Sequence, residues 1–505
     1  MINMLKDQIK TAGSLPHSLY RAEQIKEFEG AAAQLAGLTL YDLMKVAGQA
    51  CYDVFKTHFP NAGKVLVFTG QGNNGGDGYI FAGIAKKAGL EVQLCQMGDP
   101  GNVANDARRA KKTWEKGQGK IETIEQANIG ATDVIVDALL GTGLSGGLRP
   151  EFKSLIAKIN QAGKAVLSVD IPSGLNADSG AVNPVAIKAA ATVTFVGLKQ
   201  GLFTGAGANH CGQLYCSGLG ITQYFADLAV SDVSRVSYQD LTHLLKKRQR
   251  DSHKGQFGKT LVIGGNIGMP GAVRLAAESA LRSGSGLVKV LTRQENHNAV
   301  IFGRPELMLQ YYSEKTASED LFEDWPTVLV IGPGLGLDDW AQSLLKRVIG
   351  TELPCVVDAD ALTLLASKPV CKDNWILTPH PGEAAKLLGT GIAEIEKDRF
   401  SAVRRLQSIY GGIVILKGAG SLICDGKQTF LANVGNPGMA SGGMGDVLSG
   451  IIGGLLAQGL NSLDAARLSV CIHGDAADLA AQQGERGLLA SDLFSYIRKL
   501  VNPSC

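Results

Sequence analysis

Near its C-terminal end the chain reads NPGMASGGMGD over residues 436–446, followed by the apolar run VLSGII over residues 447–452. The apolar run predicts a buried helix, so the glycines that precede it lie at the helix N-terminus. Such a terminus offers unpaired N–H groups and the positive end of the helix dipole, which both favour phosphate. Asp446 stands in the first turn, where a carboxylate can accept a proton from a hydroxyl that attacks the phosphate. The stretch therefore predicts a phosphoryl-transfer site.

A simpler explanation of this stretch is a glycine-rich helix cap in which Asp446 only satisfies backbone donors. The phosphate site is favoured because four further glycine-rich turns follow strand-like runs in the same half of the chain. Glycines in these positions let a backbone approach a ligand closely.

The composition indicates a globular protein of two or more domains. The chain has 505 residues, which is too many for one ordinary core, with 45% hydrophobic and 19% charged residues. A formal net charge of +2 gives no strong field for nucleic acid or a membrane surface. The nine cysteines form no C-x-x-C pair, and neither a secretory signal nor a membrane span is evident. We expect a cytoplasmic protein with reduced cysteines.

The first half predicts a strand at residues 64–69, a glycine-rich loop at 70–78 and a helix from Tyr79. Gly70, Gly72 and Gly75 fit the spacing G-x-G-x-x-G, which is a weak motif alone. The loop is also polar, and its amide and carboxylate oxygens suit a ribose, a phosphate-bound water or a hard cation. The alternative is a hydrogen-bonded tight turn without any ligand.

Further strands alternate with helices through this half, which predicts a doubly wound α/β sheet. Asn74, Asp137, Asp170 and Ser173 fall at or just past the carboxyl ends of predicted strands, where such sheets bind ligands. The strands are expected at residues 91–97, 133–140, 165–174, 191–198 and 213–218, after a helical segment at 17–59.

Polar and basic residues at 228–258 predict a connector, with domain boundaries at 1–230 and 231–505. The second half repeats the α/β alternation, with a small-residue helix at 273–282. Its strands are expected at residues 259–263, 286–291, 327–331, 354–362, 375–377, 412–416 and 429–432.

The second half resembles the ribokinase-like superfamily, because its glycine-rich GMGD stands before a buried helix. Four segments are similar to ADP- or ATP-dependent NAD(P)H-hydrate dehydratases: GPGLG at 332–336, VDAD at 357–360, TPHPGE at 378–383 and KGA at 417–419. The first half resembles NAD(P)H-hydrate epimerases in NNGGD at 73–77 and VDIPSG at 169–174. Together the two halves resemble the bifunctional NAD(P)H-hydrate repair enzymes, with a Rossmann-like and then a ribokinase-like domain.

The resemblance implies that the second domain dehydrates the S form of hydrated NADH or NADPH (NADHX, NADPHX), consuming ADP and releasing AMP and phosphate. Asp446 is then the base that activates the ring hydroxyl, with Gly445 beside the transferred phosphoryl group. Lys417, Gly418, Ala419, Gly420 and Ser421 match the segment that holds AMP, and Ala272, Gly334, Gly336 and His380 match positions that hold the hydrate. For His380 the residues alone favour another role, which is to fix its turn between two prolines.

The resemblance implies that the first domain interconverts the R and S hydrates, with Asp170 in acid–base work. Asn74, Asp137 and Ser173 match a potassium site. Residues matching the dinucleotide cradle are Asn73, Asn74, Gly75, Gly76 and Asp77, together with Gly141, Thr142, Gly143, Leu144, Ser145, Gly146 and Gly147. Mg²⁺ and K⁺ are the implied ions, and a homo-oligomer is expected.

Two other functions remain open from the sequence. One is a small-molecule kinase fused to a dinucleotide-binding domain, which leaves a stable phosphorylated product. The other is a first half that only binds a nicotinamide dinucleotide, as a sensing or interaction module. No residue decides between ADP and ATP.

Overall fold

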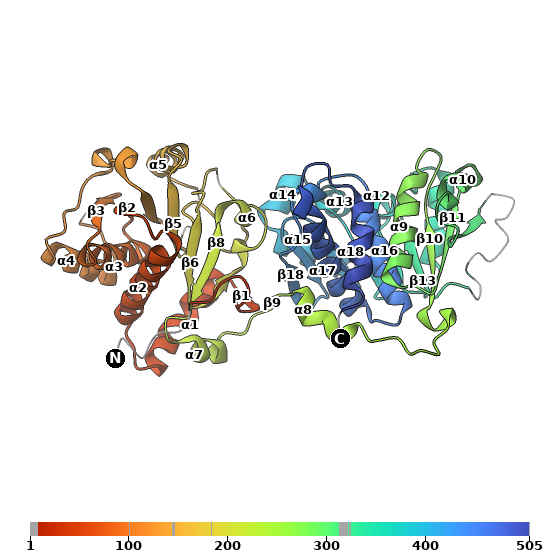
Figure 1. Ribbon diagram of the computed structural model, residues 1–505, viewed down its shortest axis with the longest axis horizontal. Helices are drawn as coiled ribbons and strands as arrows, with labels where there is room; N and C mark the ends of the chain where they lie inside the picture. The colour runs from red at the N-terminus through yellow and green to blue at the C-terminus, as the bar shows by residue number, and fades with distance from the viewer. Residues whose placement is uncertain are drawn as a thin grey trace. The chain divides into compact units, whose positions relative to one another are not determined.

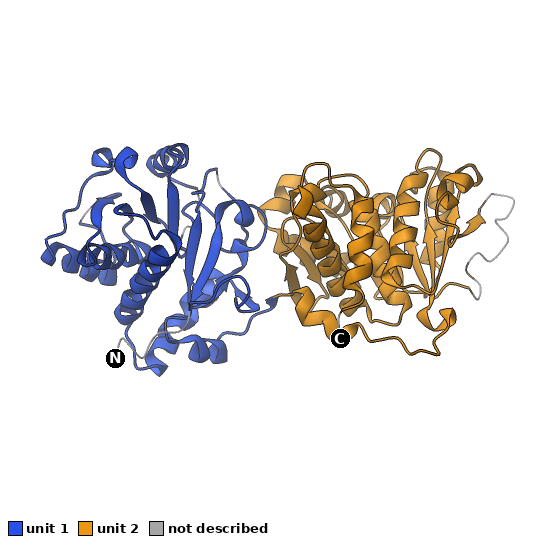
Figure 2. Ribbon diagram, viewed as in Figure 1, with its two compact units in different colours: residues 1–234 blue, residues 235–505 orange. Residues whose placement is uncertain are grey.

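The computed structural model describes residues 9–99, 101–143, 147–182, 184–312, 322 and 325–503. The chain divides into two compact units, residues 1–234 and 235–505 (Figure 2). Each unit contains a mainly parallel sheet with helices around it, which confirms the predicted α/β class (Figure 1).

The sheet of the first unit runs in the order β3-β2-β4-β5-β6-β8, and all of its neighbouring strands are parallel. The order reverses between β2 and β4, and open α/β sheets bind ligands at such a switch point. The bounds are β2 (Lys64–Thr69), β3 (Glu91–Gln96), β4 (Val134–Ala138), β5 (Ala165–Val169), β6 (Ala191–Phe195) and β8 (Gln213–Ser217). Three short strands lie outside this sheet: β1 (Ser18–Tyr20) pairs with β7 (Leu198–Lys199) and β9 (Val233–Arg235).

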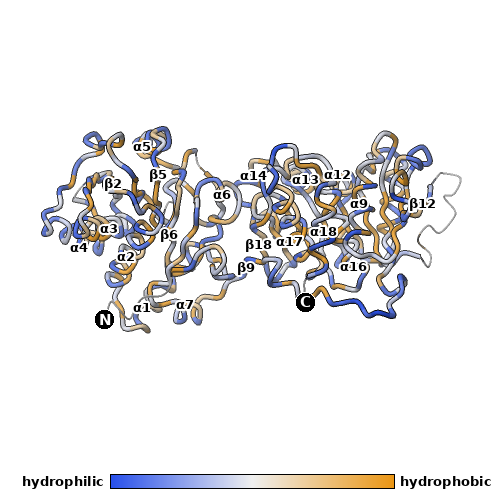
Figure 3. The backbone as a smooth tube through the Cα atoms, in the orientation of Figure 1, coloured by the Kyte–Doolittle hydropathy of each residue, from blue (hydrophilic) through white to orange (hydrophobic). Residues whose placement is uncertain are grey.

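Apolar side chains cover both faces of this sheet. One core joins the strands to α2 (Leu40–His58) and α3 (Asn73–Lys87), and the other joins them to α5 (Pro150–Gln161). The central strands are accordingly hydrophobic along the backbone tube in Figure 3. The remaining helices of the unit are α1 (Ala22–Leu35), α4 (Asn105–Lys116), α6 (Gly207–His210) and α7 (Thr222–Leu228).

Several predictions for the first unit are wrong in detail. The expected loop at 70–78 is short, because α3 already begins at Asn73. Its glycines serve packing: a Cβ at Gly75 would lie 2.2 Å from the carbonyl oxygen of Gly70, and one at Gly78 would lie 2.6 Å from Ala138. Ser18–Tyr20 is a strand in the segment predicted to be helical, because it pairs with β7 and β9. The sequence pattern does not reveal these tertiary contacts.

The sheet of the second unit runs β12-β11-β10-β13-β14-β15-β16-β17-β18, and its order reverses between β10 and β13. Strands β10 to β16 pair in parallel, and β17 and β18 continue antiparallel. The bounds are β10 (Lys259–Ile263), β11 (Leu287–Thr292), β12 (Met308–Tyr311), β13 (Val328–Ile331), β14 (Cys355–Val357), β15 (Trp375–Leu377), β16 (Ile413–Leu416), β17 (Ser421–Cys424) and β18 (Thr429–Ala432).

The main core of this unit lies between the sheet and three helices, α9 (Pro270–Ser283), α16 (Met444–Ala457) and α17 (Ser462–Ala480). Helices α9 and α16 pack backbone to backbone: a Cβ at Gly450 would lie 2.0 Å from the carbonyl oxygen of Ala276. The other helices are α8 (Tyr238–Leu241), α10 (His297–Ile301), α11 (Asp339–Ile349), α12 (Ala359–Ser367), α13 (Pro381–Leu388), α14 (Ile392–Lys397), α15 (Arg399–Tyr410) and α18 (Leu493–Leu500).

Two predictions for the second half also need correction. The strand expected at 354–362 ends at Val357, because Asp358 is the N-cap of α12. The predicted connector at 228–258 contains β9 and α8. In the part of the chain that the structure describes, no helix is long and apolar enough to cross a membrane.

Candidate functional site

The Gly-Asp segment opens α16, as the sequence predicts. Gly443 is the N-cap with a φ of +88°, and Asp446 lies in the first turn. A Cβ at Gly445 would lie 3.1 Å from the Lys417 ammonium nitrogen and 3.5 Å from the Asp358 carboxylate. The missing side chain of Gly445 therefore lets a charged pair approach the helix N-terminus.

That charged pair is the ion pair of Lys417 and Asp358. Lys417 Nζ lies 2.9 Å from Asp358 Oδ1, and Asp358 is 1% exposed. Ser449, one turn along α16, donates to Asp358 Oδ2 at 2.7 Å. Lys417 Nζ also lies 3.8 Å from Glu383 Oε2 at the start of α13. The carboxyl ends of β14 and β16 thus bring this pair to the first turns of α16 and α13.

These charges set the acidity of Asp446. Burial, followed by the charge of Asp358, raises its pKa to about 7, although Lys417 opposes the shift. Burial also raises the pKa of Glu383. A general base is most effective when its pKa lies near the working pH. Asp446 therefore has both the position and the acidity to accept a proton from a bound hydroxyl.

The buried guanidinium of Arg399 packs against the backbone of the Lys417–Ser421 segment. It donates to the carbonyl oxygens of Leu416 at 3.4 Å and Lys417 at 3.2 Å. Gly418 has a φ of +142°, and a Cβ there would lie 2.8 Å from the guanidinium. Arg399 thus stabilises this turn through hydrogen bonds to its backbone. The ammonium of Lys417 points to Asp358 and to the backbone of Gly445, at the N-terminus of α16.

The structure brings together Ala272, Gly334 and Gly336, which are three of the four residues that the resemblance assigns to the hydrate. A Cβ at Gly334 would lie 3.2 Å from Ala272 Cβ, and Gly336, two residues further along, donates its N–H to Asp360 Oδ2 at 2.8 Å. Both glycines have positive φ, at +57° and +75°.

His380, the fourth of these residues, caps α13. Its Nδ1 accepts from the N–H of Gly382 at 2.9 Å and of Glu383 at 3.3 Å. The geometry therefore supports the turn-fixing role. The imidazole is also half exposed, and its Nε2 lies 3.4 Å from Glu383 Oε1.

In the first unit, Asn74, Asp137 and Ser173 meet around Leu140, at the reversal between β2 and β4. The buried Asp137 carboxylate accepts from Ser173 N at 2.8 Å and Ser173 Oγ at 2.6 Å. Ser173 Oγ lies 3.2 Å from the carbonyl oxygen of Leu140, to which Asn74 Nδ2 donates at 2.9 Å. Asn74 Oδ1 is buried without a hydrogen-bond partner. This orphaned oxygen in an oxygen-only set fits a hard cation such as K⁺.

Asp170 pairs with a residue that the sequence did not single out, Lys199. Lys199 is 1% exposed, and its ammonium contacts Asp170 Oδ1, Thr194 Oγ1 and the carbonyl oxygen of Phe195. Asp170 itself has a φ of +64°, a conformation that is uncommon outside glycine but tolerated by Asp. Lys199 ends the short strand β7, and a lysine inside an apolar strand-like run was its only signal in the sequence.

Two further carboxyl groups face this pair. Burial, then the charges of Asp170 and Glu29, raises the pKa of Asp77 well above its ordinary value. Burial also raises the pKa of Glu29, on α1, with Lys199 opposing the shift. Asp170, Asp77, Glu29 and Lys199 therefore form one cluster of three carboxyl groups and one ammonium.

The rest of the predicted dinucleotide cradle is only partly described. Gly75 and Gly76 are buried in the first turn of α3, whereas Asn73 is exposed. A Cβ at Gly141 would lie 3.1 Å from Asn74 Cβ, so this turn touches the proposed cation site. Thr142 is half-buried, and Gly143 and Gly147 are exposed. Leu144, Ser145 and Gly146 lie outside the described residues.

Within the described ranges, no group of three or more His, Cys, Asp or Glu side chains is arranged to hold a metal ion.

The raised pKa of Asp446 predicts how the free energy of unfolding depends on pH. As pH rises from 3.8 to about 7, the unfolded chain releases this proton before the folded protein does. The free energy of unfolding therefore falls across this window and stays lower above it. We expect Asp446→Asn to raise the free energy of unfolding by ~1–3 kcal/mol more at pH 8 than at pH 5. Urea titration at both pH values measures the difference.

The exposed Asp339 of the same unit supplies the matched control. Asp339→Asn should change the free energy of unfolding equally at both pH values. An equal effect of Asp446→Asn at pH 5 and pH 8 would contradict the raised pKa.

Comparison with known proteins covers nearly the whole chain. The family model described as YjeF-related protein N-terminus matches residues 40–201, and the model of NAD(P)H-hydrate dehydratase matches residues 260–499. The ADP/ATP-dependent NAD(P)H-hydrate dehydratase of Bacillus subtilis, co-crystallised with ATP and Mg²⁺, is 29% identical over 52% of this chain and 96% of its own, with a TM-score of 0.49.

Two curated relatives carry the description bifunctional NAD(P)H-hydrate repair enzyme. The protein of Coxiella burnetii is 47% identical over 96% of this chain and 99% of its own length. The protein of Escherichia coli is 45% identical over 98% of this chain and 96% of its own length. At this identity over both units, the chain belongs to the family of bifunctional NAD(P)H-hydrate repair enzymes.

Proposed function

We propose that residues 231–505 dehydrate S-NADHX and S-NADPHX with ADP as phosphoryl donor. The position of Asp446 carries the proposal, because a carboxyl group with a pKa of about 7 stands at a helix N-terminus suited to phosphate. Asp446 accepts the proton of the ring hydroxyl as the hydroxyl oxygen bonds to the β-phosphorus of ADP and AMP leaves. Phosphate then leaves the ring carbon, and loss of a neighbouring C–H proton restores the double bond.

Other residues of this site handle charge and position. The Lys417 ammonium, fixed by Asp358, lies beside the backbone of Gly445, where negative charge develops on the transferred phosphoryl group. The backbone of residues 418–421 binds the AMP portion. Mg²⁺ neutralises phosphate charge when bound, and it usually takes one or two protein carboxylates together with substrate phosphates. Glu383, at the start of α13, is the carboxylate placed to hold it, because Lys417 and Ser449 already occupy both oxygens of Asp358.

We propose that residues 1–230 interconvert the R and S hydrates at the Asp170–Lys199 pair. The ammonium and the neighbouring carboxyl groups can exchange protons with the substituents of the hydrated ring. Asn74, Asp137, Ser173 and the carbonyl oxygen of Leu140 would hold K⁺, which supplies a fixed positive charge for the dinucleotide phosphates. A chain that joins both activities repairs both epimers. Homo-oligomer formation and a cytoplasmic location stay predictions.

The most direct test supplies the purified protein with mixed R- and S-NADHX, ADP, Mg²⁺ and K⁺. We expect all the hydrate to return to NADH, with one AMP formed for each NADH, because each dehydration consumes one ADP. Absorbance at the NADH band follows the reaction, and chromatography counts AMP.

Two other outcomes are possible, and each shows which assignment fails. Conversion that stops when the S form is exhausted would remove the epimerase assignment and leave a binding module. A stable phosphorylated hydrate without NADH would establish the kinase alternative instead.

The acid–base assignment of Asp170 is tested separately. We expect Asp170→Asn to lower the rate of R-to-S conversion by roughly a hundredfold or more, which is typical for loss of a general acid–base group. Dehydration of pure S-NADHX should stay at the wild-type rate. The exposed Asp227 of the same unit provides the control Asp227→Asn, which should keep both rates. Wild-type epimerisation by Asp170→Asn would rule out this role.

A further inference from the structure

The crevice between β10 and β13 is the point where the strand order of the second unit reverses. The loops that leave these strands, residues 264–269 and 332–338, are in direct contact. Gly265 N donates to the carbonyl oxygen of Pro333 at 2.9 Å, and Asn266 N donates to that of Gly334 at 2.6 Å. Ligands of open α/β sheets bind in such a crevice. The loop at 332–338 also carries both glycines assigned to the hydrate.

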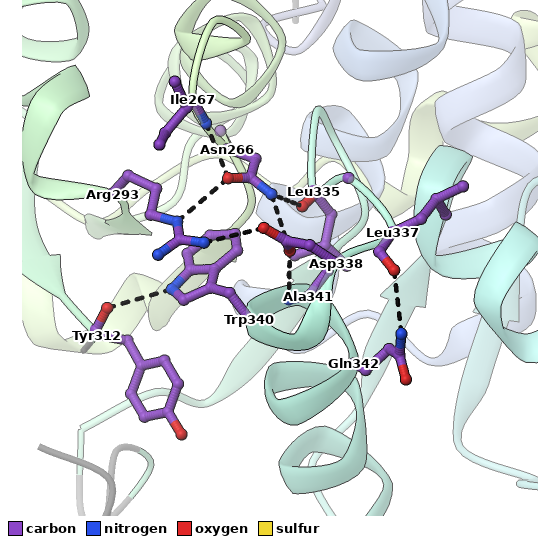
Figure 4. A network of polar contacts seen from close by, with 12 residues as sticks. Asn266, Ile267, Arg293, Tyr312, Leu335, Leu337, Asp338, Trp340, Ala341 and Gln342 are labelled. Carbon is purple, nitrogen blue, oxygen red and sulfur yellow. Dashed lines mark hydrogen bonds and ion pairs between the residues drawn. The ribbon is translucent and has the colours of Figure 1, made fainter. Parts of the chain in front are cut away.

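The side chain of Asn266 crosses this crevice, as Figure 4 shows. It is 7% exposed and makes four hydrogen bonds. Oδ1 accepts from Ile267 N at 2.8 Å and Arg293 Nε at 3.1 Å. Nδ2 donates to the carbonyl oxygen of Leu335 at 3.1 Å and to Asp338 Oδ1 at 3.0 Å. Both donors and both acceptor positions of the amide are therefore used.

Arg293 and Asp338 fix the orientation of this amide. The guanidinium only donates and the carboxylate only accepts, so a flipped amide would lose both contacts. Arg293 also pairs with Asp338 Oδ2 at 3.0 Å, which closes a ring of three side chains. Its guanidinium lies 4.6 Å from the centre of the Trp340 ring (Figure 4). Three side chains from three different strand-end loops thus form one rigid connection.

This connection controls the position of the glycine turn. A Cβ at Gly336 would lie 2.6 Å from Asn266 Nδ2, so the amide touches the turn directly. From the opposite side, Asp360 Oδ2 accepts the N–H of Gly336 at 2.8 Å. A Cβ at Gly334 would lie 2.8 Å from the carbonyl oxygen of Met269, in the same loop as Asn266. The position of the glycine turn against the loop at 264–269 therefore depends on the Asn266 amide together with these backbone contacts.

We propose that Asn266 is a positioning residue of the dehydratase, which acts with Arg293 and Asp338 to hold the glycine turn at the spacing that the hydrated dinucleotide requires. The inference rests on the proposed function of this unit. Asn266 acts through Gly334 and Gly336, and the ADP segment at 417–421 belongs to other strand ends. Loss of the amide therefore weakens binding of the hydrate and leaves ADP binding nearly unchanged.

The test compares full-length variants with S-NADHX and ADP varied separately. Asn266→Asp places a second carboxylate against Asp338 and removes the two N–H donors. We expect it to raise the KM for the hydrate about ten- to hundredfold, the size expected for a lost hydrogen bond to a charged group. The KM for ADP should change less than about twofold, a difference well below 1.4 kcal/mol. The double variant Asn266→Asp with Asp338→Asn removes the repulsion between the two carboxylates and should recover part of the lost hydrate affinity, because the donor to Leu335 stays missing.

Gln342→Ala is the matched control, because Gln342 is exposed and donates one hydrogen bond to the same loop, at the carbonyl oxygen of Leu337. It should keep both KM values. Urea unfolding of each full-length variant, with a transition close to that of the wild type, reports that its second unit is folded. Equal rises in both KM values, or an unchanged hydrate KM in Asn266→Asp, would overturn the positioning role. Wild-type protein that forms no NADH would instead remove the proposed function, and this inference with it.

Discussion

The buried ion pair of Lys417 and Asp358 is the interaction on which the second site depends. Two charges removed from water are stable only when they are close and when hydrogen bonds satisfy their remaining atoms. Here Ser449 satisfies one Asp358 oxygen and Lys417 the other, at 2.7 and 2.9 Å. Removing one member of such a pair typically costs about 3–5 kcal/mol, because it leaves an uncompensated buried charge. The pair therefore ties β14, β16 and α16 into one rigid site.

The same pair separates the acidities of two neighbouring carboxyl groups. Although desolvation opposes it, Lys417 and the hydrogen bond from Ser449 lower the pKa of Asp358. Burial and the resulting charge on Asp358 raise the pKa of Asp446. Neighbouring carboxyl groups with pKa values pushed apart are the usual sign of divided roles in a catalytic site. Asp358 holds the ammonium of Lys417, and Asp446 has a pKa of about 7. The first unit has a comparable arrangement, in which Asp170 holds Lys199 and the nearby Asp77 has a raised pKa.

The sequence predicted best what depends on local patterns and on parallel topology. Short β-branched runs marked the strands, and the apolar run after Asp446 marked the buried helix. Because parallel strands end at one edge, Asn74, Asp137 and Ser173 could be expected to meet. Partners from distant strands could not be expected, because no local pattern marks them. Lys199, Arg399 and Asn266 are such partners, and each acts through a contact across many residues of sequence. The loop predicted at 70–78 was too long for a related reason, because the glycines there allow close packing of α3.

If Asp446 is the base, its raised pKa limits dehydration at low pH. This assignment is tested most directly by the pH dependence of kcat/KM for S-NADHX at saturating ADP. The account predicts a tenfold rise for each pH unit up to an apparent pKa of about 7, followed by a plateau. Asp446→Glu should retain a pH-dependent rise in kcat/KM. Asp446→Asn should lose this rise together with most of the dehydration rate. A wild-type profile that is flat between pH 5 and pH 8 would contradict the assignment of Asp446 as the base.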